Sequence, residues 1–141
     1  MYTTREKPLL FVFEEIMPQN VPVYFRISKN EVTPLHRHDY VEFFYTLDGV
    51  GTHVINGKRE GVRFGDACVL TPNDVHGFEP VKGNETQHMD VCIEINYFRS
   101  VCDFLSPSVA DAFLGGNCIP FKLSAEKIER IDRYIPLLYL D

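Results

Sequence analysis

The sequence has no strong concentration of positive charge. Its longest basic cluster is the pair Lys58-Arg59, and 20 acidic residues against 14 lysines and arginines leave a net charge of −6. A protein that binds the phosphate backbone of a nucleic acid carries a basic patch or stripe. We therefore expect that this chain by itself does not bind DNA or RNA.

Long apolar runs and paired cysteines are also missing. The only early apolar run covers residues 9–13 and stops at Glu14, so it is too short for a signal peptide or a membrane-spanning helix. The cysteines form no CxxC pair and no zinc-finger spacing with histidine, which predicts reduced, mostly buried thiols. They are Cys68, Cys92, Cys102 and Cys118. These absences predict a cytoplasmic protein with no membrane partner.

What the sequence does contain is the composition of one globular domain. Hydrophobic residues make up 45% of the 141 residues and charged residues 24%, which argues against a disordered chain. A chain of this length buries roughly two thirds of the surface that its unfolded form exposes. A second full domain does not fit.

Residues 1–95 carry the patterns of β-strands and no helical period. Residues 1–20 form an arm with at most one short strand, and Asn56-Gly57 predicts a tight hairpin because both residues tolerate positive φ. Strands are predicted at 21–28, 50–55, 58–64, 67–71 and 88–95. Short strands separated by turns are typical of a sandwich or barrel, so the predicted fold class is mainly β.

From Tyr97 the spacing of apolar residues becomes helical. Helices are predicted over 97–105, 108–114 and 124–138. Ser124 is a suitable N-cap for the last helix, and Pro136 predicts a kink or an end near Tyr134. The last helix has apolar residues spaced 3, 4 and 3 apart, as in the seam of paired helices. They are Ile128, Ile131, Ile135 and Leu138.

The stretch 34–49 contains the residues best suited to metal binding. His36, His38 and Glu42 stand at even positions, and an extended strand points every second side chain to one face. Imidazole and carboxylate suit first-row transition metals. The odd positions over 41–47 are almost wholly apolar. A single strand here would therefore line a cavity with one face and use the other to receive the C-terminal helices.

Glu42 is the weaker ligand on spacing alone. It lies four residues after His38, which is about 13 Å along a straight strand. Binding of one metal by both side chains requires a bend that the sequence does not reveal.

Two motifs resemble those of the cupin superfamily. The first is His36-x-His38-x3-Glu42-x6-Gly49, and the second runs from Gly65-Asp66 through a loop opened by Pro72 to His76. This chain departs from the second motif at three positions, where the family usually has proline, glycine and asparagine. The residues found there are Thr71, Asn73 and Pro80.

Nearly the whole chain is similar to the N-terminal effector-binding and dimerisation domain of AraC-type transcription factors. The apolar arm, the Asn-Tyr-Phe start of a helical tail at residue 96 and the last helix carry this resemblance. It implies a cupin fold, a double-stranded β-helix or jelly-roll barrel with C-terminal α-helices. Residues 1–96 would then form the arm and barrel, and 97–141 a helical tail of the same domain. Two copies of the chain would form a homodimer through the apolar seam of the last helix.

In that family a helix-turn-helix domain that contacts DNA follows this one. Such a domain is absent from this sequence, so we expect the chain to be a fragment of a longer protein. DNA would be a partner only through the missing domain.

The resemblance also implies a set of site residues. One divalent transition metal (Zn, Ni, Mn or Fe) would bind His36, His38, Glu42 and His76; alternatively, these residues are polar lining that contacts an organic effector. The predicted effector-binding residues are Tyr24, Arg26 and Tyr40. His53 and His88 are interpreted as single polar residues of strands.

Two functions follow from this sequence. The first is a ligand-sensing, dimerising module of a bacterial regulator, which is not an enzyme. The alternative is a small metal-dependent cupin enzyme, a dioxygenase or isomerase. The helical tail favours the regulator, because a small enzyme has no need of it.

Overall fold

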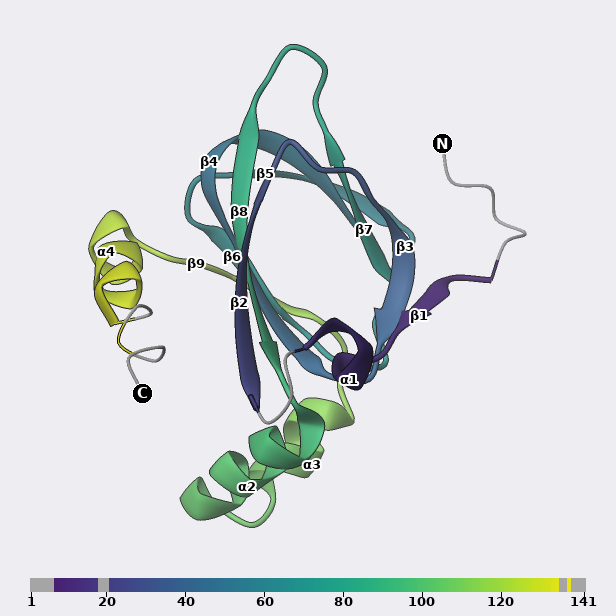
Figure 1. The fold of residues 1–141 in the computed structure, drawn as a ribbon, viewed down its shortest axis with the longest axis vertical. Helices are drawn as coiled ribbons and strands as arrows, with labels where there is room; N and C mark the ends of the chain where they lie inside the picture. The colour runs from purple at the N-terminus through teal and green to yellow at the C-terminus, as the bar shows by residue number, and fades with distance from the viewer. Residues whose placement is uncertain (1–6, 18–20, 135–136, 138–141) are drawn as a thin grey trace.

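Nine strands form one continuous sheet that curls into a barrel (Figure 1). The structure is a computed structural model that describes residues 7–17, 21–134 and 137. The elements in chain order are β1 Leu9–Phe11, α1 Phe13–Ile16, β2 Val23–Lys29, β3 Thr33–His38, β4 Val41–Ile55, β5 Lys58–Arg63, β6 Asp66–Leu70, β7 His76–Pro80, β8 Thr86–Ile93, α2 Ile95–Leu105, α3 Val109–Leu114, β9 Ile119–Lys122 and α4 Ala125–Tyr134.

Strand β4 joins the two halves of the barrel. Its first half pairs with β6 and β8, and its second half pairs with β5 and β7. Thr46 lies opposite His88 while Asp48 lies opposite Gln87, so Leu47 is an extra residue in β4. Such a β-bulge bends a strand and increases its twist. The bulge lets β4 pass from one half of the barrel to the other.

The predicted hairpin at Asn56-Gly57 is confirmed. Both residues have positive φ, 50° at Asn56 and 82° at Gly57. The register of β4 and β5 runs from the pair Ile55 and Lys58 to the pair Val50 and Arg63. The strand predictions for β2, β6 and β8 are likewise confirmed to within a few residues.

Helix α4 and strand β9 cover the outer face of β4. Tyr45 and Ile128 are buried in one apolar cluster with residues of β6 and β8, and Ile131 packs against that cluster. The Tyr45 hydroxyl donates a hydrogen bond to Asp132 Oδ1 at 3.2 Å. The odd face of the stretch 41–47 therefore receives a C-terminal helix, as the sequence predicts.

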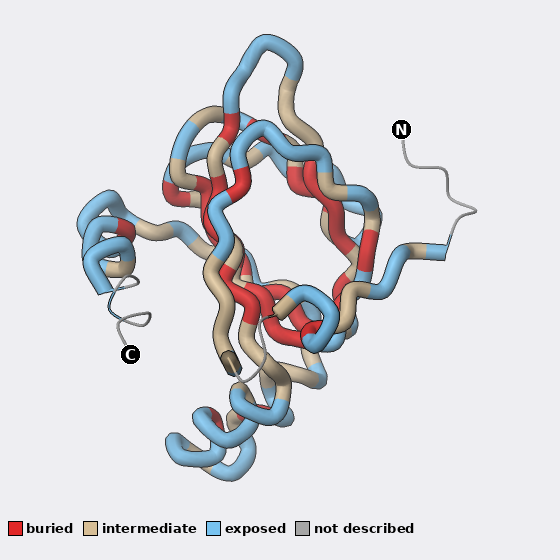
Figure 2. The backbone as a smooth tube through the Cα atoms, viewed as in Figure 1, coloured by how far each residue is buried: buried red, intermediate tan, exposed pale blue. Residues whose placement is uncertain are grey.

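The remaining helices lie apart from α4. Helices α2 and α3 contact each other below the barrel in the view of Figure 1. Figure 2 shows buried residues around the ring of strands, whereas α2 and α4 are exposed over most of their length. Among the described residues, no helix combines the length and the apolar character needed to cross a membrane.

Three features of the local structure differ from the prediction. The stretch 34–49 is not one strand, because a bend at Asp39 separates β3 from β4. The arm contains the short helix α1, which has too few residues to reveal a helical period. The sequence predicts a loop that leads to His76 but does not predict strand β7, which begins at that residue. The sequence of β7 lacks the apolar alternation of a typical strand, because the strand needs a glycine where it approaches β3. A Cβ atom at Gly77 would lie 2.8 Å from the Thr33 carbonyl oxygen.

The predicted helices are present. Helix α2 begins at Ile95, where Glu94 accepts hydrogen bonds from the amides of the first turn. Ser124 caps α4 as predicted, because its hydroxyl accepts a hydrogen bond from the Lys127 amide. The described part of α4 ends at Tyr134. Ile135, Pro136 and Leu138 lie outside the described residues, so the kink expected near Pro136 stays a prediction.

Candidate metal centre and ligand pockets

The bend between β3 and β4 brings His38 to Glu42. His38 Nε2 lies 3.1 Å from Glu42 Oε2, although the two residues would be far apart in a straight strand. Tyr40 holds the bend in place, because it is buried and its ring stacks on the His38 ring at a centroid distance of 4.3 Å. His38 Nδ1 lies 2.6 Å from the Tyr40 carbonyl oxygen. A proton on Nδ1 leaves the Nε2 lone pair directed toward Glu42.

His76 approaches the same carboxylate from β7. It lies opposite His36 in the register of β3 and β7, and its Nε2 atom is 3.1 Å from Glu42 Oε2. His36 Nδ1 lies 2.9 Å from the Pro34 carbonyl oxygen, which fixes its ring in the same way. One ligand atom from each of His36, His38, Glu42 and His76 lies within 4.8 Å of the others, and all four residues are buried. The structure thus brings the four predicted metal ligands together.

The charges of this cluster suit a cation. Burial acts to raise the pKa of Glu42, but the imidazoles of His76 and His38 outweigh it and hold that pKa well below its ordinary value. Burial and the neighbouring His76 lower the pKa of His36 to about 4. Near neutral pH, Glu42 is therefore a carboxylate and His36 a neutral imidazole, which are the forms that bind metals.

Two histidine nitrogen atoms of the cluster lack a hydrogen-bond partner among the described residues. His38 Nε2 and His76 Nε2 are buried, and neither makes a contact with hydrogen-bond geometry, although each faces Glu42. An unsatisfied buried polar atom is costly. A divalent cation between the three side chains would satisfy both nitrogen atoms, so the residues present fit a metal.

A network of hydrogen bonds fixes the loop that precedes His76. The buried Asp74 accepts hydrogen bonds from the Thr71 amide, the Asn56 side chain and the Cys118 amide. Asn73 donates to the Leu114 and Gly116 carbonyl oxygens. Two of the departures from the cupin motif, Thr71 and Asn73, therefore tie this loop to the segment after α3, since Thr71 also donates to Gly116.

His53 contacts the cluster, which the sequence did not reveal. Its Nε2 atom lies 3.0 Å from His76 Nδ1, and the side chain is buried. His53 is not one of the four clustered residues, as the sequence predicts, but it is paired with His76 and is not an isolated polar residue. Counted from Glu42, position 53 falls on the outer face of β4, but the extra residue Leu47 reverses the alternation and turns His53 inward. The Gly49 that follows the bulge was the one available signal.

The histidine pocket is a cavity of about 310 Å³ beside the four clustered residues. The predicted effector-binding residues Tyr24, Arg26 and Tyr40 all line it, together with His36, Glu42 and His76. Arg26 forms an ion pair with Glu31 and is about half exposed, which places its guanidinium near solvent. The walls thus offer a cation, phenol groups and carboxylates to a small polar ligand.

Asp90 is a second residue of this pocket that the sequence did not identify. Burial and the charge of Glu42 raise its pKa to about 7. His88 Nε2 lies 3.4 Å from Asp90 Oδ2, and both residues line the histidine pocket. The pocket therefore contains an acid that can donate a proton near neutral pH.

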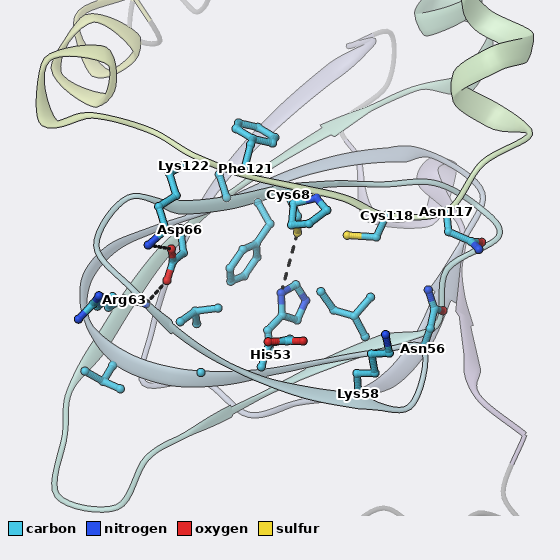
Figure 3. Close-up of a pocket in the computed structure, with 18 residues that line it drawn as sticks. His53, Asn56, Lys58, Arg63, Asp66, Cys68, Asn117, Cys118, Phe121 and Lys122 are labelled. Atoms are coloured by element: carbon cyan, nitrogen blue, oxygen red, sulfur yellow. Dashed lines mark hydrogen bonds and ion pairs between the residues drawn. The ribbon is translucent and has the colours of Figure 1, made fainter.

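A larger cavity opens on the other side of the barrel (Figure 3). This β5–β9 pocket has a volume of about 1080 Å³, and residues of β4, β5, β6 and β9 line it. Phe44 and His53 line both cavities and so stand between them. Cys68 and Cys118 also line the β5–β9 pocket, and all four cysteines of the chain are free thiols.

Comparisons with known proteins identify the family of this chain and support its fold. The profile of the family described as AraC-like ligand binding domain matches residues 20–103, more than half of the chain. The HTH-type transcriptional activator RhaR of Pectobacterium carotovorum subsp. carotovorum (strain PC1) is 31% identical over 71 residues, which are 50% of this chain and 25% of RhaR. This chain thus spans only a part of that longer relative.

The fold is similar to that of a solved structure that covers most of this chain. ToxT from Vibrio cholerae strain SCE256, with an unsaturated fatty acid bound, superposes with a TM-score of 0.62 at 9% identity, over 86% of this chain and 48% of ToxT. A cupin protein from Bacteroides fragilis has a TM-score of 0.49 at 16% identity, over 52% of this chain and 67% of the cupin. The predicted cupin fold, mainly β with C-terminal helices, is confirmed by the curled sheet and the helices that follow it.

Proposed function

Because this chain belongs to the family of AraC-like ligand-binding domains of transcription regulators, we propose that it binds a small-molecule effector in the histidine pocket and is not an enzyme. The observation that carries the proposal is that Tyr24, Arg26 and Tyr40 share one cavity with the buried histidines. ToxT is a structural relative with a bound fatty acid, which supports a small organic ligand here. We place the protein in the cytoplasm.

Strand β4 offers a route from the pocket to the C-terminal helix. Glu42 and Phe44 line the histidine pocket, while the intervening Phe43 and the next residue Tyr45 contact the apolar cluster that holds α4. A ligand that binds two positions of β4 with different affinity would also bias the position of α4. We propose that this bias reaches DNA through a separate helix-turn-helix domain.

Two tests address this proposal. The gene is expected to continue beyond Asp141 into helix-turn-helix motifs, and a stop codon directly after Asp141 would contradict the regulator. A thermal-shift screen of sugars and small carboxylates on the purified chain should yield a ligand. Its affinity should fall at least about tenfold in Arg26→Gln and Tyr40→Leu, in line with the loss of one polar contact, but not in Arg99→Gln on the exposed face of α2.

We further propose that His36, His38, Glu42 and His76 hold one divalent transition metal. Three imidazoles and a carboxylate suit Zn, Ni, Mn or Fe, and the metal would supply a cationic anchor for an anionic or hydroxylated effector. His53 would position His76 through its hydrogen bond.

The metal proposal is tested with the metal alone. The protein is first freed of metal with a chelator, which is then removed. Addition of Ni²⁺ or Zn²⁺ should raise its thermal stability, and calorimetry should show one equivalent bound. Loss of the residue that hydrogen-bonds to a metal-binding histidine typically weakens metal affinity about 10–100-fold. His53→Phe should therefore weaken metal binding by that factor. The control variant Arg99→Gln, on the exposed face of α2, should leave the affinity unchanged. Absence of stoichiometric metal binding would contradict the proposed metal site.

We propose homodimerisation through α4 on the strength of its apolar seam. Ile128 is buried against the barrel and Ile131 is half-buried there, so these residues hold α4 on β4. The rest of the seam, Ile135 and Leu138, lies outside the described residues. Sedimentation of the wild-type chain should show a dimer that Ile135→Glu converts to a folded monomer. A wild-type chain that is monomeric at high concentration would overturn this proposal.

A metal-dependent cupin enzyme is the second candidate, favoured by the four clustered ligands. In that case, metal-loaded protein would consume oxygen or isomerise a substrate. Metal-loaded wild-type protein that shows no turnover in a screen of sugars and carboxylates, yet binds a ligand, would exclude this candidate.

A further inference from the structure

Two thiols lie together on the wall of the β5–β9 pocket. Cys68 Sγ lies 4.0 Å from His53 Nδ1, and His53 separates it from the four clustered residues. Cys68 belongs to β6, and Cys118 directly precedes β9. In the register of these strands Cys68 lies opposite Pro120, two residues after Cys118. Side chains two residues apart in an extended segment point to the same face, so both thiols face the cavity. Figure 3 shows them side by side.

Backbone contacts hold Cys118 at this position. Its amide donates a hydrogen bond to the buried carboxylate of Asp74 at 2.9 Å. The preceding Gly116 accepts hydrogen bonds from the side chains of Thr71 and Asn73. The segment that carries Cys118 is thus tied to the loop after β6, and the two sulfur atoms share a hydrogen bond.

The two thiols differ in exposure and in acidity. Cys118 is half-buried and reaches a cavity of about 1080 Å³, whereas Cys68 is 4% exposed. The hydrogen bond from Cys68 lowers the pKa of Cys118, and the same bond together with burial raises the pKa of Cys68. An accessible, acidic thiol beside a buried partner is the arrangement of oxidation-sensitive cysteine pairs.

We propose that Cys68 and Cys118 are a peroxide-sensitive pair that closes reversibly to a disulfide on the wall of the β5–β9 pocket. The Cys118 thiolate attacks one oxygen of hydrogen peroxide, so that an S–O bond forms, the O–O bond breaks, and hydroxide leaves as water with the proton that Cys118 released. Cys68 then attacks the sulfenic sulfur. The S–S bond forms, the S–O bond breaks, and the hydroxide leaves as water with the Cys68 proton.

The electrons balance over the two steps. The two sulfur atoms lose two electrons in total, and one molecule of peroxide gains them as it becomes two molecules of water. A dithiol reductant reverses the reaction by thiol–disulfide exchange. The disulfide would join β6 to the segment between α3 and β9, so oxidation would restrain the chain that leads to α4.

The wild-type chain itself provides the test. Reduced protein is treated with hydrogen peroxide, its remaining thiols are blocked with N-ethylmaleimide, and the intact chain and its peptides are weighed. Compared with a reduced control blocked in the same way, we expect two fewer maleimide adducts on the intact chain. The peptides of Cys68 and Cys118 should be recovered as one cross-linked species that is two hydrogens lighter than the two reduced peptides together. Dithiothreitol should restore both free thiols.

Variants identify the role of each sulfur. Cys118→Ser should form no disulfide, and Cys68→Ser should accumulate a sulfenic acid at Cys118 that dimedone traps. The matched double variant Cys92→Ser and Cys102→Ser should react like the wild type. Circular dichroism checks the fold of each variant. Recovery of all four thiols unchanged, a cross-link to Cys92 or Cys102, or irreversible oxidation of Cys118 alone in the wild type would each overturn the proposal.

Discussion

At the scale of single residues, Asp74 joins three separate segments of the chain. Its carboxylate is fully buried and accepts hydrogen bonds from the Asn56 side chain, from the amide and hydroxyl of Thr71, and from the Cys118 amide. These donors come from the β4–β5 turn, the loop after β6 and the segment before β9. One side chain thereby sets the loop that carries His76.

Asp74→Ala should destabilise the protein by more than about 3 kcal/mol, because several buried donors lose their acceptor at about 1–3 kcal/mol each. Urea denaturation measures the free energy of unfolding. The matched variant Asp111→Ala removes a carboxylate that is exposed and paired with Arg99, so it should cost no more than about 1 kcal/mol. Equal effects of the two variants would contradict this role.

The buried histidines predict a stability that depends on pH. Burial, followed by the neighbouring His76, lowers the pKa of His36 to about 4 and that of His53 to about 3, from an ordinary value of 6.5. Between pH 4 and pH 6.5 the unfolded chain therefore binds more protons than the folded chain, and stability rises with pH. The lowered pKa of Glu42 adds stability only above the ordinary glutamate pKa of 4.5, so its loss comes at lower pH.

The lowered pKa values of the two histidines would together cost about 6 kcal/mol of unfolding free energy between pH 7 and pH 4, and the raised pKa of Asp90, which favours the folded protein at low pH, would offset about 3 kcal/mol. Metal-free protein should therefore lose about 2–4 kcal/mol over this range. Urea denaturation at several pH values in the presence of chelator measures this loss. His53→Asn removes one of the two titrating histidines, so its stability should depend less steeply on pH. A stability that stays level across this range, with the same profile in His53→Asn, would contradict the lowered pKa values of the two histidines.

At the scale of secondary structure, the bulge in β4 decides where side chains point. The extra residue Leu47 is followed by Gly49, which has a φ of 74°. A Cβ atom at Gly49 would lie 1.6 Å from the Glu85 carbonyl oxygen. Only glycine combines this conformation with so close an approach of β4 to the β7–β8 connection. The bulge places Glu42 and His53 on the same inner side of the barrel.

Gly49→Ala should therefore destabilise the protein by more than about 2 kcal/mol, from the left-handed conformation and the steric clash together. It should also weaken metal binding, because His53 would no longer support His76. Gly61→Ala is the matched control in β5, since nothing lies within 4 Å of a Cβ atom there. Denaturation curves of the two variants that coincide would show that β4 does not need the bulge.

At the scale of the whole molecule, the negative net charge of the chain disfavours contact with DNA. The chain has a net charge of −6. The two cavities lie on opposite sides of Phe44 and His53, and α4 packs on the outside of β4. An acidic surface does not supply the basic patch that a DNA-binding protein uses to contact phosphates.

The isolated chain should therefore show no binding of duplex DNA in fluorescence anisotropy at about 0.1 M salt. The parent protein, if it carries the proposed helix-turn-helix domain, should bind with an affinity that falls steeply as salt rises. Salt-dependent binding by the isolated chain would contradict the assignment of DNA contact to another domain.

The sequence by itself determined the features that depend on neighbouring residues. The alternation in β2, the Asn56-Gly57 hairpin, the Ser124 cap and the helices of the tail are local patterns, and the structure contains all of them. The cupin-like spacing of His36, His38, Glu42 and His76 also named the four residues that come together. These predictions hold because turn and strand preferences act over a few residues.

Only the tertiary structure decided which distant residues meet. The bend at Asp39, the inward turn of His53 after Leu47 and the pairing of Cys68 with Cys118 depend on strands that are far apart in the chain. One extra residue in β4 reverses every later side chain, and nothing in the local pattern fixes where that residue falls. Sheet register is set by the partner strands and their packing, so the contacts around the four ligands required the folded molecule.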